Sequence, residues 1–107
     1  MTDTPAFSSF KEFYPYYLGE HSNAVCRALH YVGSTLALLI LVYSVVSANY
    51  FGILGGLLVG YGFAWTGHFF FEHNRPATFQ YPLWSFMGDW VMLKDFLSGK
   101  FRGSVTD

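Results

Sequence analysis

The sequence predicts an all-α membrane protein, built as a two-span antiparallel transmembrane helical hairpin with flanking interfacial amphipathic helices. Only 12% of its 107 residues are charged, against roughly 25% in ordinary soluble domains. The 44 residues between Arg27 and Glu72 contain no Asp, Glu, Lys or Arg. A stretch of that length can supply two bilayer spans of about 20 residues each. We therefore expect a single membrane domain over residues 1–107.

The first element is expected at the membrane interface, over residues 7–20. Its sequence, FSSFKEFYPYYLGE, mixes aromatic rings with charged side chains and contains Pro15. Tyr and Phe rings favour the depth of the lipid headgroups. Proline disrupts a helix interior because it lacks a backbone N–H. We predict a short, broken amphipathic segment here.

The first span is predicted over residues 24–48. Ser22 and Asn23 offer side-chain oxygens that can cap the start of a helix. From Tyr31 to Ala48 the chain carries no charge. This uncharged part is about 27 Å long as an α-helix, which roughly matches the hydrocarbon thickness of a bilayer.

The second span is predicted over residues 50–71, after a short turn at Asn49. So short a connection makes the two helices antiparallel neighbours, and it places His30 and His68 at equal depth because both lie equally far from Asn49. The second span carries small residues four positions apart, a pattern typical of close helix packing. These are Gly52, Gly56 and Gly60. From equal distances to the turn, we expect Ala37 to meet Gly60 or Tyr61 and Ser34 to meet Ala64. Packing in a homodimer is the alternative use of these glycines.

The part after the second span is predicted to leave the membrane as an aromatic loop, because Asn74, Pro76 and Pro82 interrupt a helix. From residue 82 to residue 98, apolar residues recur every three or four positions, which indicates an amphipathic helix lying along the membrane. A polar tail follows over residues 99–107.

The charge distribution predicts the orientation. All six Lys and Arg residues lie outside the uncharged stretch, so the positive-inside rule places both termini and the histidines on the cytoplasmic side. The expected location is the bacterial inner membrane, or the endoplasmic reticulum membrane in a eukaryote. The N-terminal residues lack the basic start and apolar run of a cleaved leader, and we expect none.

Two function classes are disfavoured by composition. A net charge of −1 provides no basic face for nucleic acid. Cys26 is the single cysteine, so a disulfide within the chain and a thiolate metal site are both disfavoured. We interpret Cys26 as a small buried residue.

The four histidines are the candidate catalytic and metal-binding residues. His21 and His30 flank the start of the first span, and His68 and His73 flank the end of the second. Folding the hairpin collects them in one interfacial layer. Neutral imidazoles bind iron, zinc and copper. Burying an ionisable side chain at such depth costs free energy, so its presence there suggests a function. His21 and His73 join the other two only if the helices break near Asn23 and end or bulge near Glu72.

Five charged residues near this layer are candidates to support the site or bind substrate. A carboxylate can complete a metal's ligand set or accept a hydrogen bond from an imidazole N–H, and a guanidinium can hold a lipid carboxylate. Solvation of helix ends, mutual ion pairs and ordinary phospholipid contacts are the alternatives. The candidates are Glu20, Arg27, Glu72, Arg75 and Asp89.

Four segments of the chain resemble a known family. They are FYPYYLGEH, RALHYVGST, GYGFAWTGHFFFEHNRPATFQYPLWS and GDWVML. They are similar to the small membrane family, formerly a domain of unknown function, that includes the yeast 2-hydroxy fatty acid dioxygenase. With two clear spans, the chain resembles the compact bacterial members of that family.

The resemblance implies an Fe(II)-dependent enzyme of fatty acid α-oxidation that uses O2 to shorten a long-chain 2-hydroxy fatty acid by one carbon. It implies the metal set His21, His30, His68 and His73. Four imidazoles and a bidentate substrate would fill an octahedral shell, so we expect one imidazole to be displaceable or outside the shell. The partners would be this substrate, O2 and membrane lipid, and a homo-oligomer is also expected.

Two alternatives remain open at this point. His30 and His68 could ligate one haem from two helices. The hairpin could instead be non-enzymatic and assemble with other membrane proteins through its glycine face.

Overall fold

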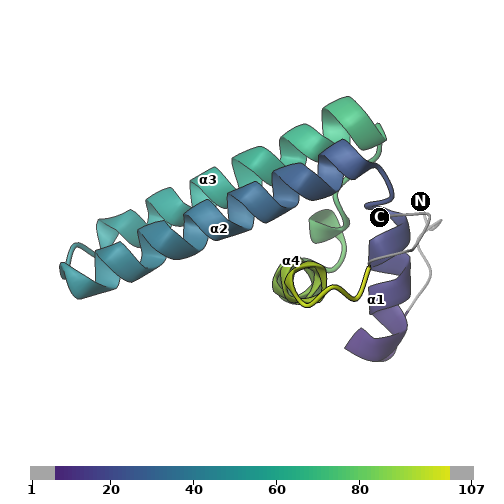
Figure 1. Ribbon diagram of the computed structural model, residues 1–107, viewed down its shortest axis with the longest axis horizontal. Coiled ribbons are helices and arrows are strands. Elements are labelled where there is room, and N and C mark those ends of the chain that lie inside the picture. The colour runs from purple at the N-terminus through teal and green to yellow at the C-terminus, as the bar shows by residue number, and fades with distance from the viewer. Residues whose placement is uncertain (1–6, 102–107) are drawn as a thin grey trace.

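The structure is a computed structural model, and it describes residues 7–101. Within this range the chain forms helices and no strand (Figure 1). In chain order the elements are α1 (Phe10–Gly19), α2 (Ala24–Val46), α3 (Phe51–Gly67), the π-helix η1 (His68–Glu72), the 3₁₀-helix η2 (Ala77–Phe79) and α4 (Pro82–Leu97). Residues 102–107 of the predicted polar tail lie outside the described part of the chain.

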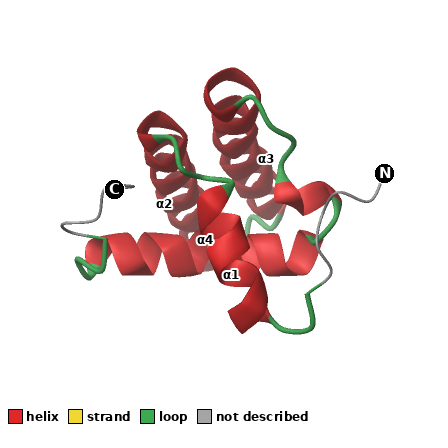
Figure 2. Cartoon of the chain, turned by 90° about the vertical axis from the view of Figure 1, so that its right-hand side faces the viewer, coloured by secondary structure: helices red, strands yellow, loops and turns green. Residues whose placement is uncertain are grey.

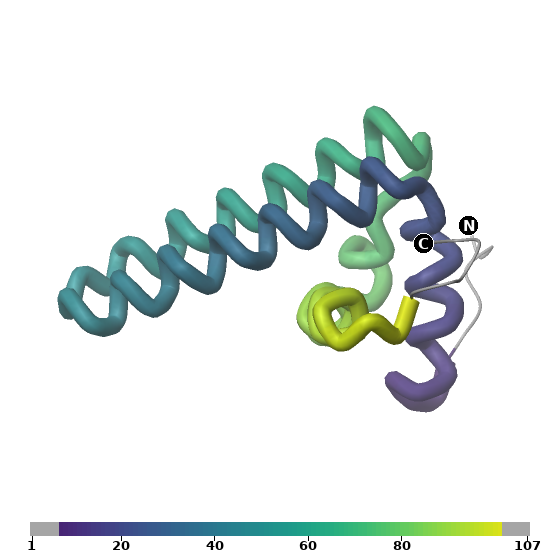
Figure 3. The backbone as a smooth tube through the Cα atoms, viewed as in Figure 1, coloured from purple at the N-terminus to yellow at the C-terminus, as the bar shows by residue number. Residues whose placement is uncertain are grey.

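Helices α2 and α3 lie side by side and run in opposite directions, as Figures 1 and 3 show. The Oδ1 atom of Asn23 accepts hydrogen bonds from the backbone N–H groups of Val25 and Cys26, at 2.9 and 3.1 Å, and so caps α2. At the far end the chain reverses through Ala48, whose φ of 57° is left-handed. Helix α2 ends two residues before the predicted end of the first span, and α3 begins one residue after the predicted start of the second. The turn between them is therefore longer than expected.

The predicted glycines lie between α2 and α3. A Cβ atom on Gly60 would lie 3.4 Å from Cβ of Ala37, and one on Gly56 would lie 3.2 Å from the Ala37 carbonyl oxygen. A Cβ atom on Gly52 would overlap Ser44. These three glycines, here called the glycine seam, let the two backbones approach closely.

Much of the surface of α2 and α3 is apolar and exposed. Leu39, Val46 and Phe51 are 61%, 79% and 89% exposed. Both Ala24–Val46 and Phe51–Glu72 are long and apolar enough to cross a membrane, with mean hydropathies of 1.9 and 1.2. A core helix of a soluble protein would be mostly buried, whereas these helices are largely uncovered. The pattern indicates association with a membrane.

The buried core lies beside the open end of the α2–α3 pair. Helix α4 crosses that end, and α1 packs against α4, as Figure 2 shows. The core side chains are Phe13 and Tyr17 of α1, Ala77 of η2 and Met92 of α4. The hydroxyl of Tyr14 donates a hydrogen bond of 2.8 Å to Oδ2 of Asp95, which joins α1 to α4.

The prediction of a broken helix at Pro15 is wrong. Helix α1 continues from Phe10 to Gly19 with Pro15 inside it. Proline removes one backbone hydrogen bond, the one that the carbonyl of Lys11 would have accepted. Because Lys11 is exposed, water can satisfy that carbonyl. Ser9 also caps the helix, its Oγ accepting a 3.2 Å hydrogen bond from the N–H of Glu12.

Candidate metal centre

Three of the four histidines converge at the open end of the α2–α3 pair. His21 lies in the linker after α1, His30 in the second turn of α2, and His68 at the start of η1. Nε2 of His21 lies 3.1 Å from Nε2 of His30 and 2.9 Å from Nε2 of His68. The three side chains, here called the imidazole cluster, are buried and place their nitrogens close enough to hold one metal ion.

Each ring of the cluster is oriented by a hydrogen bond at its other nitrogen. Nδ1 of His21 lies 2.6 Å from the carbonyl oxygen of Tyr17. Nδ1 of His30 lies 2.8 Å from the carbonyl oxygen of Cys26. Both carbonyls are four residues earlier in the chain, and a carbonyl oxygen can only accept. Both Nδ1 atoms must therefore carry a proton and donate it.

Nδ1 of His68 has a side-chain partner, Oδ1 of Asn74, at 2.8 Å. The orientation of the Asn74 amide is fixed by its other end, because Nδ2 donates to the carbonyl oxygen of Glu20 at 3.0 Å and to Oε1 of Glu20 at 3.2 Å. His68 is therefore also protonated at Nδ1.

The three Nε2 atoms therefore carry lone pairs that point toward one another. Burial lowers the pKa of His21 well below its usual range, and the neighbouring imidazoles lower it further, so the ring is neutral. Converging lone pairs repel unless a cation lies between them. Metal-bound histidines in proteins characteristically donate their second N–H to a carbonyl or carboxylate. The donor set and its hydrogen bonds thus fit a metal ion that prefers imidazole nitrogen.

His21 reaches the cluster because α1 ends before it. Arg27 holds this linker: its Nε donates to the carbonyl oxygen of His21 at 2.5 Å and its Nη2 to that of Leu18 at 3.3 Å. The ring of Tyr17 stacks on the ring of His21, with centroids 4.0 Å apart. Arg27 thus positions the backbone of His21 and does not contact the imidazole nitrogens.

The fourth predicted ligand, His73, lies outside the cluster and is exposed. The predicted bulge near Glu72 is present: η1 is a π-helix that ends at this residue. His73 then adopts a left-handed conformation, with φ of 58°. Its successor Asn74 donates its backbone N–H to the carbonyl of His68 at 3.1 Å. The bulge therefore directs Asn74, and not His73, toward His68.

The other charged candidates take different positions around the cluster. Glu20 holds the Asn74 amide, as described above. Glu72 accepts a hydrogen bond from the backbone N–H of Asn23, which ties η1 to the start of α2. Arg75 is exposed and lies over the ring of Phe79, 5.5 Å from its centroid.

Asp89 of α4 is half-buried and lies beside the cluster, where it lines the same hollow as the three imidazoles. It accepts a hydrogen bond from the hydroxyl of Tyr17. Burial raises the pKa of Asp89 to about 7, although the Tyr17 hydrogen bond opposes the rise. Gly88 makes this contact possible, because a Cβ atom there would lie 2.9 Å from the Tyr17 ring.

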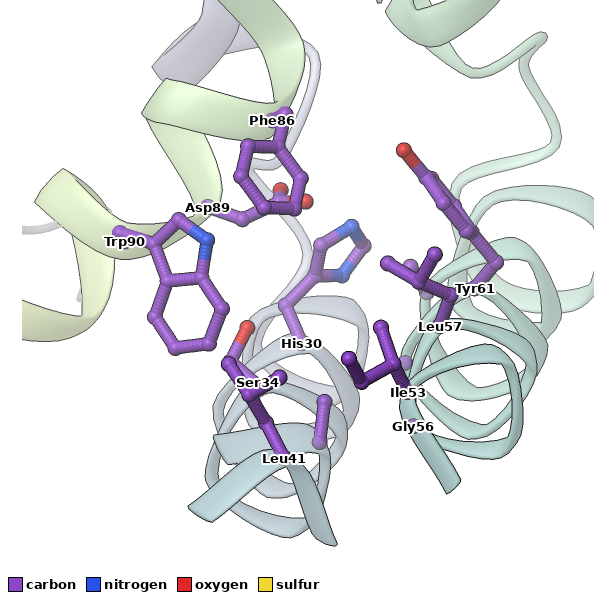
Figure 4. Close-up of a pocket in the computed structure, with 13 residues that line it drawn as sticks. His30, Ser34, Leu41, Ile53, Gly56, Leu57, Tyr61, Phe86, Asp89 and Trp90 are labelled. Atoms are coloured by element: carbon purple, nitrogen blue, oxygen red, sulfur yellow. The ribbon is translucent and has the colours of Figure 1, made fainter. Parts of the chain in front are cut away.

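Two hollows meet at the cluster. A small polar one is lined by all three imidazoles together with Tyr17, Ser85 and Asp89. A longer apolar groove begins at His30 and Asp89 and runs between α2 and α3, with Phe86 and Trp90 of α4 over its near end (Figure 4). His30, Tyr61, Ala64 and Asp89 line both hollows, so the polar hollow and the apolar groove are adjacent.

Sequence reasoning missed Tyr17 and Asn74. Tyr17 lies four residues before His21, the spacing that puts two residues on one helical face, and this was the available signal. Asn74 was interpreted only as a helix terminator. Its contact with His68 depends on the π-helix, for which the sequence offers no pattern of its own.

Comparison with known proteins supports a family assignment. A family model described as 2-hydroxy-palmitic acid dioxygenase Mpo1-like matches residues 7–101. No curated protein and no solved structure gives a significant match. The match covers the imidazole cluster and all the helices described above.

Proposed function

Because the chain belongs to the family described as 2-hydroxy-palmitic acid dioxygenase Mpo1-like, we propose that it is an iron(II)-dependent dioxygenase of 2-hydroxy fatty acids. The reaction would consume one O2 and convert the 2-hydroxy acid into the fatty acid one carbon shorter, CO2 and water. The observation that carries the proposal is the convergence of three Nδ1-protonated imidazoles through their Nε2 atoms. The family match confirms the resemblance seen in the sequence.

The proposed metal ligands are Nε2 of His21, His30 and His68. Bound iron(II) would supply the redox chemistry that a reaction with O2 requires. The sequence implied four imidazoles with one of them displaceable or outside the shell, and three imidazoles would leave positions free for substrate and O2. The hydrogen bonds at Nδ1 hold each ring in place, so the ligand set is formed before the substrate arrives.

Asp89 is the proposed contact for the polar end of the substrate. Its carboxyl group lies where the polar hollow meets the apolar groove, and Tyr17 holds it there. A carboxylate at this point can accept a hydrogen bond from the 2-hydroxyl group. It would thereby favour a 2-hydroxy acid over a plain fatty acid, which has no 2-hydroxyl group to donate this hydrogen bond.

The membrane placement is part of the proposal. In this placement α2 and α3 span the bilayer as a hairpin, while α1 and α4 lie at the interface on the cytoplasmic side together with both termini. The exposed apolar side chains of α2 and α3 would then contact lipid. Substrate would reach the cluster sideways from the bilayer.

The haem hypothesis fits the geometry less well. The ring of His21 lies 4.4 Å from the rings of both His30 and His68. A macrocycle between His30 and His68 would have to displace it. A Soret band in the purified protein would favour haem and count against the non-haem centre.

The direct test is turnover by purified protein loaded with iron(II). With 2-hydroxypalmitate labelled at its carboxyl carbon, we expect O2 uptake, labelled CO2 and pentadecanoate in equal amounts. His68→Ala should abolish all three, whereas His73→Ala should retain them. A folded, iron-loaded protein that leaves 2-hydroxy acids of every chain length untouched would overturn the proposal. A non-enzymatic hairpin predicts that outcome.

A further inference from the structure

The apolar groove has a polar end and an apolar end. At its near end lie His30 and Asp89, beside the imidazole cluster. Beyond Ser34 the lining becomes apolar, ending at Leu41 of α2 and Ile53 of α3 (Figure 4). This order matches a molecule with one polar end and a long apolar tail.

The glycine seam forms the floor of the groove. Gly56 and Gly60 pack closely against Ala37 and line the groove together with it, so no large side chain projects into the groove from its floor. Leu57, at 42% exposure, forms part of its open edge. Larger residues at the seam would collide with α2 and push the two helices apart.

The size of the groove limits its occupant. Its cavity volume is about 80 Å³, and Phe86 and Trp90 lie over its near end. A helix is about 10–12 Å in diameter with its side chains and cannot pass beneath them. A single acyl chain is thin enough, and the part that the protein does not enclose would contact lipid along the open side.

We infer that this groove holds the acyl chain of the 2-hydroxy acid, with Leu41 and Ile53 at its far end setting the preferred chain length. The inference rests on the proposed function for the identity of the polar end. From His30 to Leu41 the groove follows eleven residues of α2, about 16 Å at 1.5 Å per residue. A short acyl chain would end before Leu41, whereas a long one would reach it.

The kinetic test narrows the groove by enlarging two of the side chains that line it. Leu41→Trp and Leu57→Trp should each lower kcat/KM for 2-hydroxypalmitate roughly tenfold or more, because an apolar pocket discriminates by the methylenes that it accommodates. The value for 2-hydroxyoctanoate should stay near that of the wild type. Val42→Trp and Leu58→Trp are matched controls, since these neighbours are 51% and 66% exposed and do not line the groove. Equal losses with both substrates, or equal effects of the controls, would overturn the inference.

A second measurement does not depend on turnover. A 2-hydroxypalmitate analogue with a diazirine at its terminal carbon should label Leu41 or Ile53 on irradiation, and unlabelled 2-hydroxypalmitate should compete. Competed labelling at these residues without turnover would support the groove while counting against the dioxygenase. Turnover with labelling elsewhere would overturn the groove alone. Labelling that 2-hydroxypalmitate does not compete would identify bulk lipid or another chain as the occupant and also overturn it.

Discussion

The side-chain oxygen of Asn74 lies 2.8 Å from Nδ1 of His68 and determines which ring nitrogen of His68 faces the imidazole cluster. Asn74 is itself held by Glu20, so the ring orientation depends on a contact between η1 and the end of α1. The geometry of the cluster therefore depends on Asn74 and Glu20, which are not members of the cluster.

Asn74→Ala should weaken metal binding about 10- to 100-fold, the usual effect of removing a hydrogen-bond partner from a metal-bound histidine. Titration of the purified protein with iron(II) under anaerobic conditions measures this affinity. Gln80→Ala is a suitable control because it removes an exposed amide side chain. Equal affinities of the Asn74 variant and the wild type would show that the hydrogen bond does not orient His68.

The four histidines should separate into two classes. Changing His21, His30 or His68 to Ala removes one of three converging nitrogens, and each variant should lose most of its bound metal. His73→Ala should keep the wild-type metal content, because the exposed His73 lies outside the cluster. Elemental analysis of the purified proteins measures metal per chain. A loss in His73→Ala as large as in His68→Ala would restore the four-histidine ligand set.

Asp89 should make the stability of the metal-free protein depend on pH. Burial raises its pKa from 3.8 to about 7, so between these values the folded protein binds a proton that the unfolded chain releases. Stability therefore falls as the pH rises through this interval, by up to a few kcal/mol. Asp89→Asn does not titrate in this interval. The thermal midpoint of the variant minus that of the wild type should therefore increase from pH 4 to pH 7. Parallel pH profiles for the two proteins would contradict the raised pKa.

Gly67 should be far more sensitive to substitution than Gly62. A Cβ atom on Gly67 would lie 2.9 Å from Sγ and 3.1 Å from Cα of Cys26, whereas one on Gly62 meets nothing within 4 Å. Gly67→Ala should push the end of α3 away from α2 and lower both metal affinity and the thermal midpoint. Gly62→Ala should be neutral or stabilising by up to about 1 kcal/mol, since alanine favours a helix. Similar effects of the two changes would argue against close contact at Gly67.

Much of the architecture could be predicted from the sequence because it depends on long patterns. The uncharged stretch and the four-residue spacing of Gly52, Gly56 and Gly60 hold over many turns, and small errors at their ends do not change the result. The prediction that His30 and His68 lie at equal depth follows from the same pattern, because both are equally far from Asn49 in the sequence. Their rings lie 4.9 Å apart in the structure.

The predictions that depended on one residue were less secure. Pro15 was expected to break a helix that continues through it. His73 was expected to reach the site, but the left-handed backbone at that position turns its side chain outward. Such outcomes are decided by a single φ angle or hydrogen bond, and the contact between Asn74 and Glu20 joins residues 54 positions apart. No local pattern encodes a contact of that kind.

The order of the ligands along the chain has a consequence for biosynthesis. His68 follows His21 by 47 residues, and Asn74 and Asp89 come later still. Because a chain leaves the ribosome N-terminus first, an emerging polypeptide lacks the third imidazole until His68, about two thirds of the way along the 107 residues, has been made. The proposed metal could therefore be held by all three imidazoles only after His68 has emerged, and a product truncated before His68 would lack the third ligand.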